Sequence, residues 1–580
     1  MTSYAPALFS CANTGDDEVE PKCSPCDKKA TNICTQCFLV QCCSRDCQKA
    51  HWSLHKPDCK SPLTKTTWKP SWETEKRKPA FMDSSPGFSP NNGPSATVHG
   101  QRKYLWGNMP AFDVLNLKQN EGADTTRDFR LLFAASGDLR NAATTVAGLP
   151  SSYTGQCELI LNDIDTDIVV RNAILLLVAL IFDPEVAAPM MLHLWYSALI
   201  PAQTLRSLQE KVAPLIQEVY TKIQGKAEDS LQAKTWTYGS SSLRIVLKKS
   251  QWRTMLRYFQ VPEGLSAEEA QKLRKTTSLA PERIDYLHRG LFILPPASRV
   301  GMMKFRSDGI LLPFGASRKL FDTPNPTVFQ SRDFWPMMDW ADPLHGWSTA
   351  DVRGKVPLAK NDLYGGLFFH VHDLLLKFCE RLKSMKVAFT LFQVNALELP
   401  EILRNAGLLK QGFDRVEVSN ISDGGFVGIA RVLFSLSLLL RLKTGNPHST
   451  LITLFLNAIH EVNTDMKSSL TMKSDLAKVS KYLPRPSITD PRLRSCSAAL
   501  MDWIESRIMF WDFDKIFGEY MLKVGFEEMA RETGMCMKKE NTVIEAWPLR
   551  LRGDASQREF DVLRSSSYTG CERYVEWKRA

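Results

Sequence analysis

The sequence has no apolar run long enough to cross a bilayer. The longest, Ile168–Phe182, contains Arg171 and is flanked by Asp167 and Asp183. It is shorter than the ~20 residues that a membrane-spanning helix requires. Residues 1–19 also lack the basic and apolar segments of a secretory signal. We therefore expect a protein that has no membrane contact and resides in the cytoplasm, the nucleus or both.

Cysteine is scarce along most of the chain and abundant in one short segment. Of 14 cysteines, eight lie between Cys23 and Cys59, and five follow that segment. Disulfides in secreted domains would be distributed through the fold, whereas clustering in a chain without a signal indicates metal binding.

A large net charge of one sign is also absent from most of the chain. The net charge is +10, and the segment from Lys60 to Lys103 holds eight basic against three acidic residues, about half of that excess. This segment is also rich in proline, glycine and serine, which is typical of a solvated linker. A nucleic-acid footprint is the alternative interpretation, and we do not expect one. Trp68, Trp72, Phe81 and Phe88 are unusual in a free linker. We expect them to anchor the segment to the body, with partner docking as the alternative.

The cysteine-rich segment has the spacing of zinc ligands. Two CxxC pairs precede a CxxxC pair and an HxxxC pair, so the candidate ligands are Cys23, Cys26, Cys34, Cys37, Cys43, Cys47, His55 and Cys59. Eight ligands suffice for two tetrahedral Zn²⁺ sites, in which each Zn–S bond is about 2.3 Å long. A segment of this size cannot bury enough apolar surface alone, so we expect the metal to supply its folding energy.

The run from Cys43 to Cys59, CSRDCQKAHWSLHKPDC, resembles a MYND finger, and the resemblance extends over Cys23–Cys59. It implies interleaved ligands, with Cys23, Cys26, Cys43 and Cys47 on one zinc and Cys34, Cys37, His55 and Cys59 on the other. Where the family usually has an aromatic residue, this chain has Cys42, which leaves Cys42 and Cys43 as alternative ligands; register favours Cys43. His51 could compete with His55.

The resemblance also implies a function. MYND fingers act as protein-interaction modules that dock proline-containing peptides. Both zinc sites would have four protein ligands, which leaves no open position for water or substrate, as in structural rather than catalytic zinc sites.

The body is organised around a unit from Phe129 to Phe182. The apolar run Phe129–Ala135 predicts a strand, and Ser136-Gly137-Asp138 predicts a turn before a short helix. A second β-rich run, Cys157–Leu161, ends in acidic residues and precedes an apolar helix over Ile168–Phe182. This βαβα order is typical of an open parallel sheet.

The segment Tyr104–Leu117, the run LFAASGDLRN over 132–141 and the run LNDID over 161–165 resemble an uncharacterised domain. It occurs in many fungal proteins behind a MYND finger and at the N-terminus of dynein axonemal assembly factor 3. The resemblance implies a fold similar to Rossmann-type methyltransferases. We therefore expect an α/β protein with a Rossmann-like, methyltransferase-type sheet and a largely helical insertion.

In such folds a glycine turn and an acid at the second strand hold the cofactor. Gly137 and Asp163 occupy these positions, and Asn395 follows the third strand, where methyltransferases often have an acid that contacts adenine. The turn has one glycine instead of G-x-G-x-x-G, so S-adenosylmethionine binding is predicted only weakly. Asp163 and Asp165 have an alternative role as turn and N-cap residues.

Two functions of different classes remain. The first is an adaptor or regulatory protein with a non-catalytic body, and the second is an S-adenosylmethionine-dependent methyltransferase whose finger recruits substrate. The sequence contains no Asn/Asp-Pro-Pro-aromatic motif, and the Asn-His-Ser-Cys-type motif of SET-domain methyltransferases is also absent. We therefore favour the adaptor, with no catalytic residue assigned and with partner and oligomeric state open.

The expected segments follow from these patterns. They are a disordered N-terminus (1–22), a separate finger (23–59), a basic linker (60–100), the first half of the Rossmann-like domain (101–183), a mostly helical insertion (184–360), and the second half with a C-terminal region (361–580). In the last segment we expect helices over Leu367–Met385, Leu397–Asn405, Gly428–Leu442 and Asp490–Gly534, and strands over Val387–Phe392, Phe413–Ser419, Leu451–Leu456, Thr542–Leu551 and Glu572–Arg579.

Overall fold

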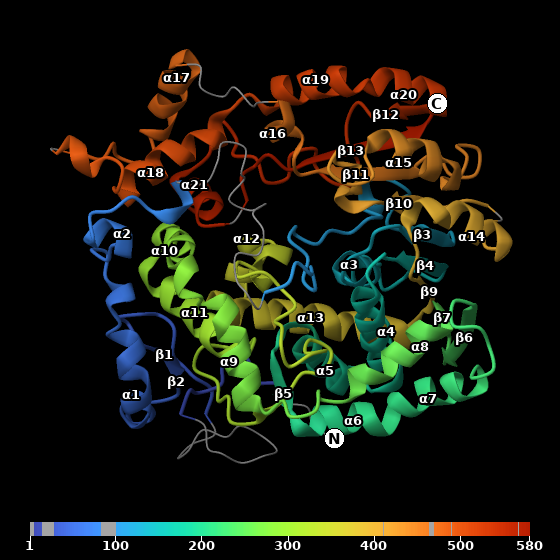
Figure 1. Ribbon diagram of the computed structural model, residues 1–580, viewed down its shortest axis with the longest axis horizontal. Coiled ribbons are helices and arrows are strands. Elements are labelled where there is room, and N and C mark those ends of the chain that lie inside the picture. Colours follow the sequence, from blue (N-terminus) through green and yellow to red (C-terminus); the bar gives the residue numbers. More distant parts are fainter. Residues whose placement is uncertain are drawn as a thin grey trace.

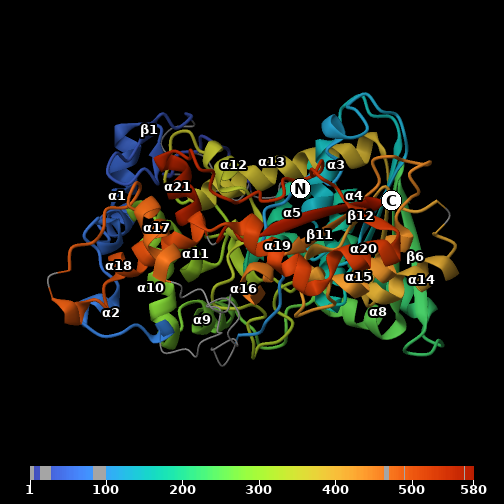
Figure 2. The same ribbon diagram turned by 90° about the horizontal axis from the view of Figure 1, so that it is seen from above.

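The computed structural model describes residues 5–13, 28–82, 100–409, 411–462, 469–488, 490–566 and 568–580. A large sheet occupies one end of the molecule, and the cysteine-rich finger occupies the other (Figures 1 and 2). Helices from the middle and the C-terminal part of the chain lie between them. Within the described residues, no helix is long and apolar enough to span a membrane.

The sheet has nine strands among the described residues, in the order β12-β13-β11-β10-β3-β4-β9-β7-β6. Their bounds are β3 Phe129–Phe133, β4 Gln156–Asn162, β6 Leu231–Tyr238, β7 Ser241–Lys248, β9 Lys386–Phe392, β10 Arg415–Glu417, β11 Thr450–Phe455, β12 Met535–Met537 and β13 Arg573–Arg579. The six strands from β11 to β7 run parallel, whereas β13 runs antiparallel to both β11 and β12, and β6 antiparallel to β7. The chain winds outward from β3 to β9 and then returns to β10, so its direction reverses between β3 and β10.

Alternate side chains of the central strands enter two separate cores. Leu131 and Leu159 face one core, whereas their chain neighbours Leu132 and Ile160 face the other. The first core is covered by α3 Arg140–Gly148, α4 Thr166–Ile181, α5 Pro184–Tyr196 and α13 Leu363–Ser384. The second is covered by α14 Leu399–Asn405, α15 Ile429–Leu436, α19 Phe513–Val524 and α20 Phe526–Thr533. Both faces of the sheet are therefore buried, which explains why its strands read as continuous apolar runs.

The predicted unit of strand, turn, helix, strand and helix is confirmed in β3, α3, β4 and α4. Gly137 adopts a φ of +54° in the turn, a conformation that glycine tolerates without strain. Helix α4 is buried on every side from Ile168 to Leu180, as its uniform hydrophobicity requires.

The middle segment is less purely helical than expected. Its helices are α5, α6 Ala202–Lys211, α7 Ala213–Lys222, α8 Lys249–Met255, α9 Ala267–Ser278, α10 Ile284–Ile293, α11 Pro296–Asp308 and α12 Thr349–Gly354. It also contributes the hairpin β6–β7 to the edge of the main sheet, and the separate pair β5 Leu199–Pro201 and β8 Phe321–Pro324. Residues of β7 alternate between buried and less buried positions, as expected for a strand at a sheet margin.

The C-terminal region confirms one expected strand and corrects another. β13 pairs with β11, and the helices α18 Ala498–Glu505, α19 and α20 lie within Asp490–Gly534, which was expected to be helical. The helices α16 Ala458–Val462, α17 Ser469–Val479 and α21 Gln557–Arg564 lie outside that range. The strand expected over Thr542–Leu551 is absent, and these residues have no regular structure. The backbone N–H groups of Thr542, Val543 and Ile544 donate instead to the Glu576 carboxylate, which replaces a neighbouring strand as their acceptor.

The finger consists of β1 Asn32–Ile33, β2 Gln41–Cys42 and α1 Arg45–Cys59, and it packs on the body rather than standing apart. Residues 5–13, which we expected to be disordered, lie against it; for example, the Ala12 N–H donates to the Gln41 carbonyl. The following segment, with α2 Ser71–Thr74, is attached to α10. Trp72 is buried there, and Arg77 forms an ion pair with Asp285, so this part of the predicted linker is anchored to the body. Phe88 lies outside the described residues.

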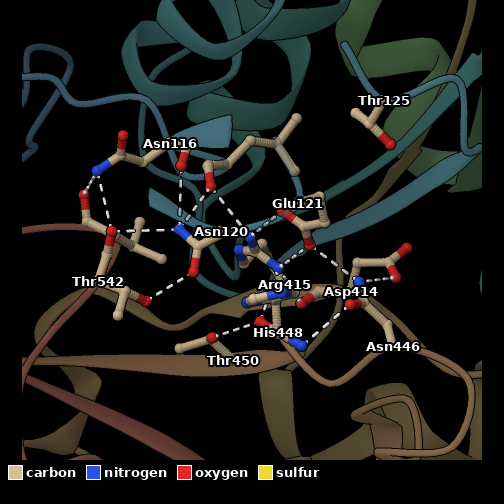
Figure 3. Close-up of polar contacts among 12 residues, drawn as sticks. Asn116, Asn120, Glu121, Thr125, Asp414, Arg415, Asn446, His448, Thr450 and Thr542 are labelled. Atoms are coloured by element: carbon tan, nitrogen blue, oxygen red, sulfur yellow. Dashed lines mark hydrogen bonds and ion pairs between the residues drawn. The ribbon is translucent and has the colours of Figure 1, made fainter. Parts of the chain in front are cut away.

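A buried polar network joins the segment 114–121 to distant residues at the start of β10 (Figure 3). Arg415 donates to both carboxylate oxygens of Glu121, at 3.0 and 2.8 Å, and to the carbonyls of Val114 and Leu115. Asn446 links Glu121 to Asp414. The guanidinium, although buried, is therefore fully provided with acceptors.

Candidate functional sites

One of the two expected ligand sets lies entirely within the described residues. The ligand atoms of Cys34, Cys37, His55 and Cys59 all lie within 4.8 Å of one another. The Sγ atoms of Cys34 and Cys59 are 3.7 Å apart, and Cys37 Sγ lies 3.3 Å from His55 Nε2. His55 and Cys59 are four residues apart on α1, which places both side chains on one helix face.

The second ligand set is described in part. Cys43 Sγ and Cys47 Sγ are 3.3 Å apart, while the predicted ligands Cys23 and Cys26 lie outside the described residues. Helix α1 begins after Ser44, whose side chain accepts a hydrogen bond from the Cys47 N–H and so holds this thiol at the first turn.

Cys11 joins the second set, which sequence reasoning missed. Its thiol lies within 4.8 Å of the Cys43 and Cys47 thiols, and it also contacts Cys42. Cys43 therefore groups with Cys47, as register predicted, and Cys42 does not. His51 stacks beside His55, with ring centroids 6.2 Å apart, and is not part of either group.

The donor set fits zinc. Three thiols and one imidazole in a buried cluster match the ligands of structural Zn²⁺ sites. Burial raises the pKa of the Cys37 thiol well above its usual range and lowers that of His55 to about 4. Cys37 and His55 thus favour their neutral forms, whereas hydrogen bonds outweigh burial at Cys34 and lower the pKa of its thiol. A bound cation would stabilise the thiolate form of Cys37.

A large cavity of about 1100 Å³ lies outside the carboxyl ends of the parallel strands. Its sheet side is lined by residues that follow β3, β4, β9, β10 and β11, and its other side by residues of α10, α11 and the segment 502–511. Because the winding reverses between β3 and β10, the cavity lies where open α/β sheets bind their ligands.

All three residues predicted to contact a cofactor, Gly137, Asp163 and Asn395, line this cavity. The Gly137 N–H, the Asp163 carboxylate and the Asn395 side-chain oxygen, however, already have hydrogen-bond partners within the protein. Asp163 accepts hydrogen bonds from the N–H groups of Gly137 and Asp165, each at 2.9 Å. Asn395 accepts from the Leu397 N–H at 3.0 Å. Asp165 caps α4, as the alternative interpretation proposed. The turn N–H that would face a cofactor is thus already bonded.

Sequence reasoning missed the acids deepest in the cavity wall. Glu417 ends β10 and is only 4% exposed, and burial raises its pKa to about 7. Glu572 immediately precedes β13, and burial raises its pKa as well. The sequence signal that could have revealed Glu417 is an acid within the apolar run Val416-Glu417-Val418. It lies at the carboxyl end of its strand, just as Asp163 directly follows the carboxyl end of β4.

A family model described as "MYND finger" matches residues 23–59, and one described as "Domain of unknown function (DUF4470)" matches residues 105–200. Each match covers much less than half of the chain. No curated protein and no solved structure gave a significant match. The finger thus provides a zinc-dependent protein-interaction module, and the matched part of the body carries no functional description.

Proposed function

We propose that this protein is an adaptor whose zinc finger docks proline-containing peptides and whose body does not catalyse a reaction. The closed four-ligand cluster of Cys34, Cys37, His55 and Cys59 carries the proposal. With four protein ligands, a zinc ion there has no free position for a substrate, so its role is to hold a binding surface.

The test is peptide binding by the full zinc-loaded chain, measured by fluorescence anisotropy. A labelled proline-rich peptide should bind saturably, and the same peptide with every proline replaced by alanine should not. Cys34→Ser should abolish binding. Lys49→Ser, on the exposed face of α1 outside both clusters, should leave it unchanged. Equal binding of both peptides, or full binding by Cys34→Ser, contradicts the proposal.

The body supports a second candidate, a methyltransferase that uses S-adenosylmethionine. The strand order around the reversal, with an antiparallel strand inserted near one edge, is that expected of a Rossmann-like methyltransferase sheet, and the cavity lies over its carboxyl ends.

The turn argues against this candidate. Asp163 already accepts the Gly137 N–H, and Asp138 adds a second carboxylate, which pairs with Arg140 at 2.7 Å. The carboxylate of a cofactor would therefore meet a Gly137 N–H that is already hydrogen-bonded and would lie beside the negative charge of Asp138. Calorimetry with S-adenosylmethionine should show no binding in the micromolar range. Tight binding that is lost in Asp163→Ala would instead establish the cofactor site.

A further inference from the structure

The cavity has an uneven distribution of unpaired charge. On its helical side, three arginines are each neutralised by a carboxylate: Arg283 pairs with Asp339 at 2.8 Å, Arg289 with Glu505 at 2.9 Å, and Arg564 with Asp502 at 2.7 Å. Arg306, on α11, donates to the carbonyls of Ser278 and Asp339. Arg306 has no carboxylate partner and its buried Nε lacks an acceptor among the described residues, so only the first three arginines are neutralised within the protein.

On the sheet side, two buried acids have no such partner. Glu417 Oε1 accepts the Ser419 N–H at 2.7 Å, but no described residue donates to Oε2 and no described cation pairs with the carboxylate. Glu572 is 8% exposed; its Oε1 accepts from Thr569, and its Oε2 is buried without a partner among the described residues. Both residues line the cavity.

Tyr574 on β13 connects the two acids. It lines the cavity, is 2% exposed, and no described residue forms a hydrogen bond with its phenol oxygen. Burial raises its pKa, and the negative charges of Glu417 and Glu572 raise it further, while Arg140 lowers it, so Tyr574 lies near all three groups. Arg140 on α3 is itself bonded to Asp138 and to the Gly346 carbonyl.

The unpaired acids on the sheet side of the cavity favour a positively charged ligand. A buried carboxylate without a cation is costly, and a ligand that supplies one positive charge and N–H donors removes that cost. Aromatic side chains beside the acids, Tyr568 and Tyr574, favour a cation further through their ring faces. On the sheet side of the cavity, an anion would meet the acids Glu417 and Glu572 and a Gly137 N–H group that is already bonded to Asp163.

We propose that the cavity is a binding site for a small organic cation, an alkylammonium group held by Glu417 with Glu572 as the second negative charge. The group can come from a free diamine or polyamine or from a lysine side chain. The site lies beside the reversal between β3 and β10, and it requires neither zinc nor a proline peptide.

Calorimetry on the full, zinc-loaded chain tests the proposal with 1,4-diaminobutane as probe and 1,4-butanediol as its uncharged counterpart. The diamine should bind saturably and the diol should not. Glu417→Gln, which keeps the shape and an acceptor for Ser419, should weaken binding by at least about tenfold. Glu505→Gln, an acid of the same cavity that pairs with Arg289, should bind like the wild type.

Proton release on binding distinguishes a ligand-binding role of Glu417 from a purely structural one, because a structural role would not affect it. Because its pKa is about 7, with Arg140 and Tyr574 as its facing charged or titratable neighbours, diamine binding should release close to one proton near pH 6 and far less near pH 8.5. Glu417→Gln should lose this difference, and an unchanged thermal midpoint would show that the variant is folded.

The remaining outcomes are decisive. Tighter binding of acetyl-lysine-amide (free side-chain amine) than of the diamine supports the cation site and assigns its source to a protein. Equal binding of diamine and diol, inorganic phosphate binding in place of the diamine, an unaffected Glu417→Gln variant, or no saturable diamine binding to the wild type overturns the proposal.

Discussion

Arg415 and Glu121 form an ion pair from which water is excluded, with side chains 1% and 3% exposed. Arg415→Met leaves the Glu121 carboxylate buried without its cation, and we expect unfolding to become easier by about 3–5 kcal/mol. Urea denaturation measures this change. Lys222→Met, which breaks the exposed pair with Glu218, should have no measurable effect.

The double variant Arg415→Met/Glu121→Leu separates the ion pair from simple packing. Because it removes both charges, it should be more stable than Arg415→Met alone. If the two variants were equally destabilised, the loss would come from packing and not from an unpaired charge.

The same pair predicts a pH dependence. Burial alone would raise the pKa of Glu121, but the charge and hydrogen bonds of Arg415 outweigh it and hold that pKa below its usual value. The contribution of Glu121 is therefore fully present above its unfolded pKa of about 4.3 and is lost as the pH falls through the lower folded value. Thermal unfolding midpoints of the wild type should decrease more steeply below about pH 4 than those of the double variant; parallel decreases would contradict this assignment.

At the scale of elements, α11 is the connection between the finger and the cavity. Ala297 and Val300 on this helix pack into the finger core, and Met302 and Arg306 line the cavity. Asn361 adds a direct link, since its Nδ2 donates to the Cys37 carbonyl at 2.8 Å. The finger is thus docked on the body, contrary to the expectation of a separate unit.

Zinc removal should consequently loosen α11. We expect chelation to reduce hydrogen-exchange protection of α11 amides while leaving those of α4, deep in the other core, unchanged. Asn361→Ala, which keeps every zinc ligand, should reproduce part of this loss with the metal still bound. If α11 stays protected without zinc, the finger and the body are energetically independent.

At the scale of the molecule, the predicted ligand spacing requires two zinc ions per chain. Native mass spectrometry of the full chain should find two, and Cys34→Ser should retain only one. Because binding needs thiolates, zinc affinity should decrease as the pH falls. One ion or none in the wild type would contradict the two-site assignment. Cys11→Ser should retain two ions if the four predicted ligands, including Cys23 and Cys26, complete the second site.

Features that depend on neighbours close in the chain were predictable from the amino-acid sequence. The cluster of Cys34, Cys37, His55 and Cys59 was predictable because the spacing of zinc ligands is short-range and chemically restrictive. Strand and helix patterns around Gly137 were predictable because burial repeats with the period of each element. The strand wrongly expected at Thr542–Leu551 shows the limit, since a distant carboxylate, Glu576, took up its first N–H groups.

Features that join distant segments became visible in the three-dimensional fold. Glu417 and Glu572 lie 155 residues apart, and they share one cavity because β10 and β13 flank β11 in the sheet. Cys11 reaches the finger thiols through the packing of residues 5–13, and α11 meets the finger through side chains with no local signal. Sequence periodicity reports how deeply a residue is buried, but strand order and docking determine which charges are buried together.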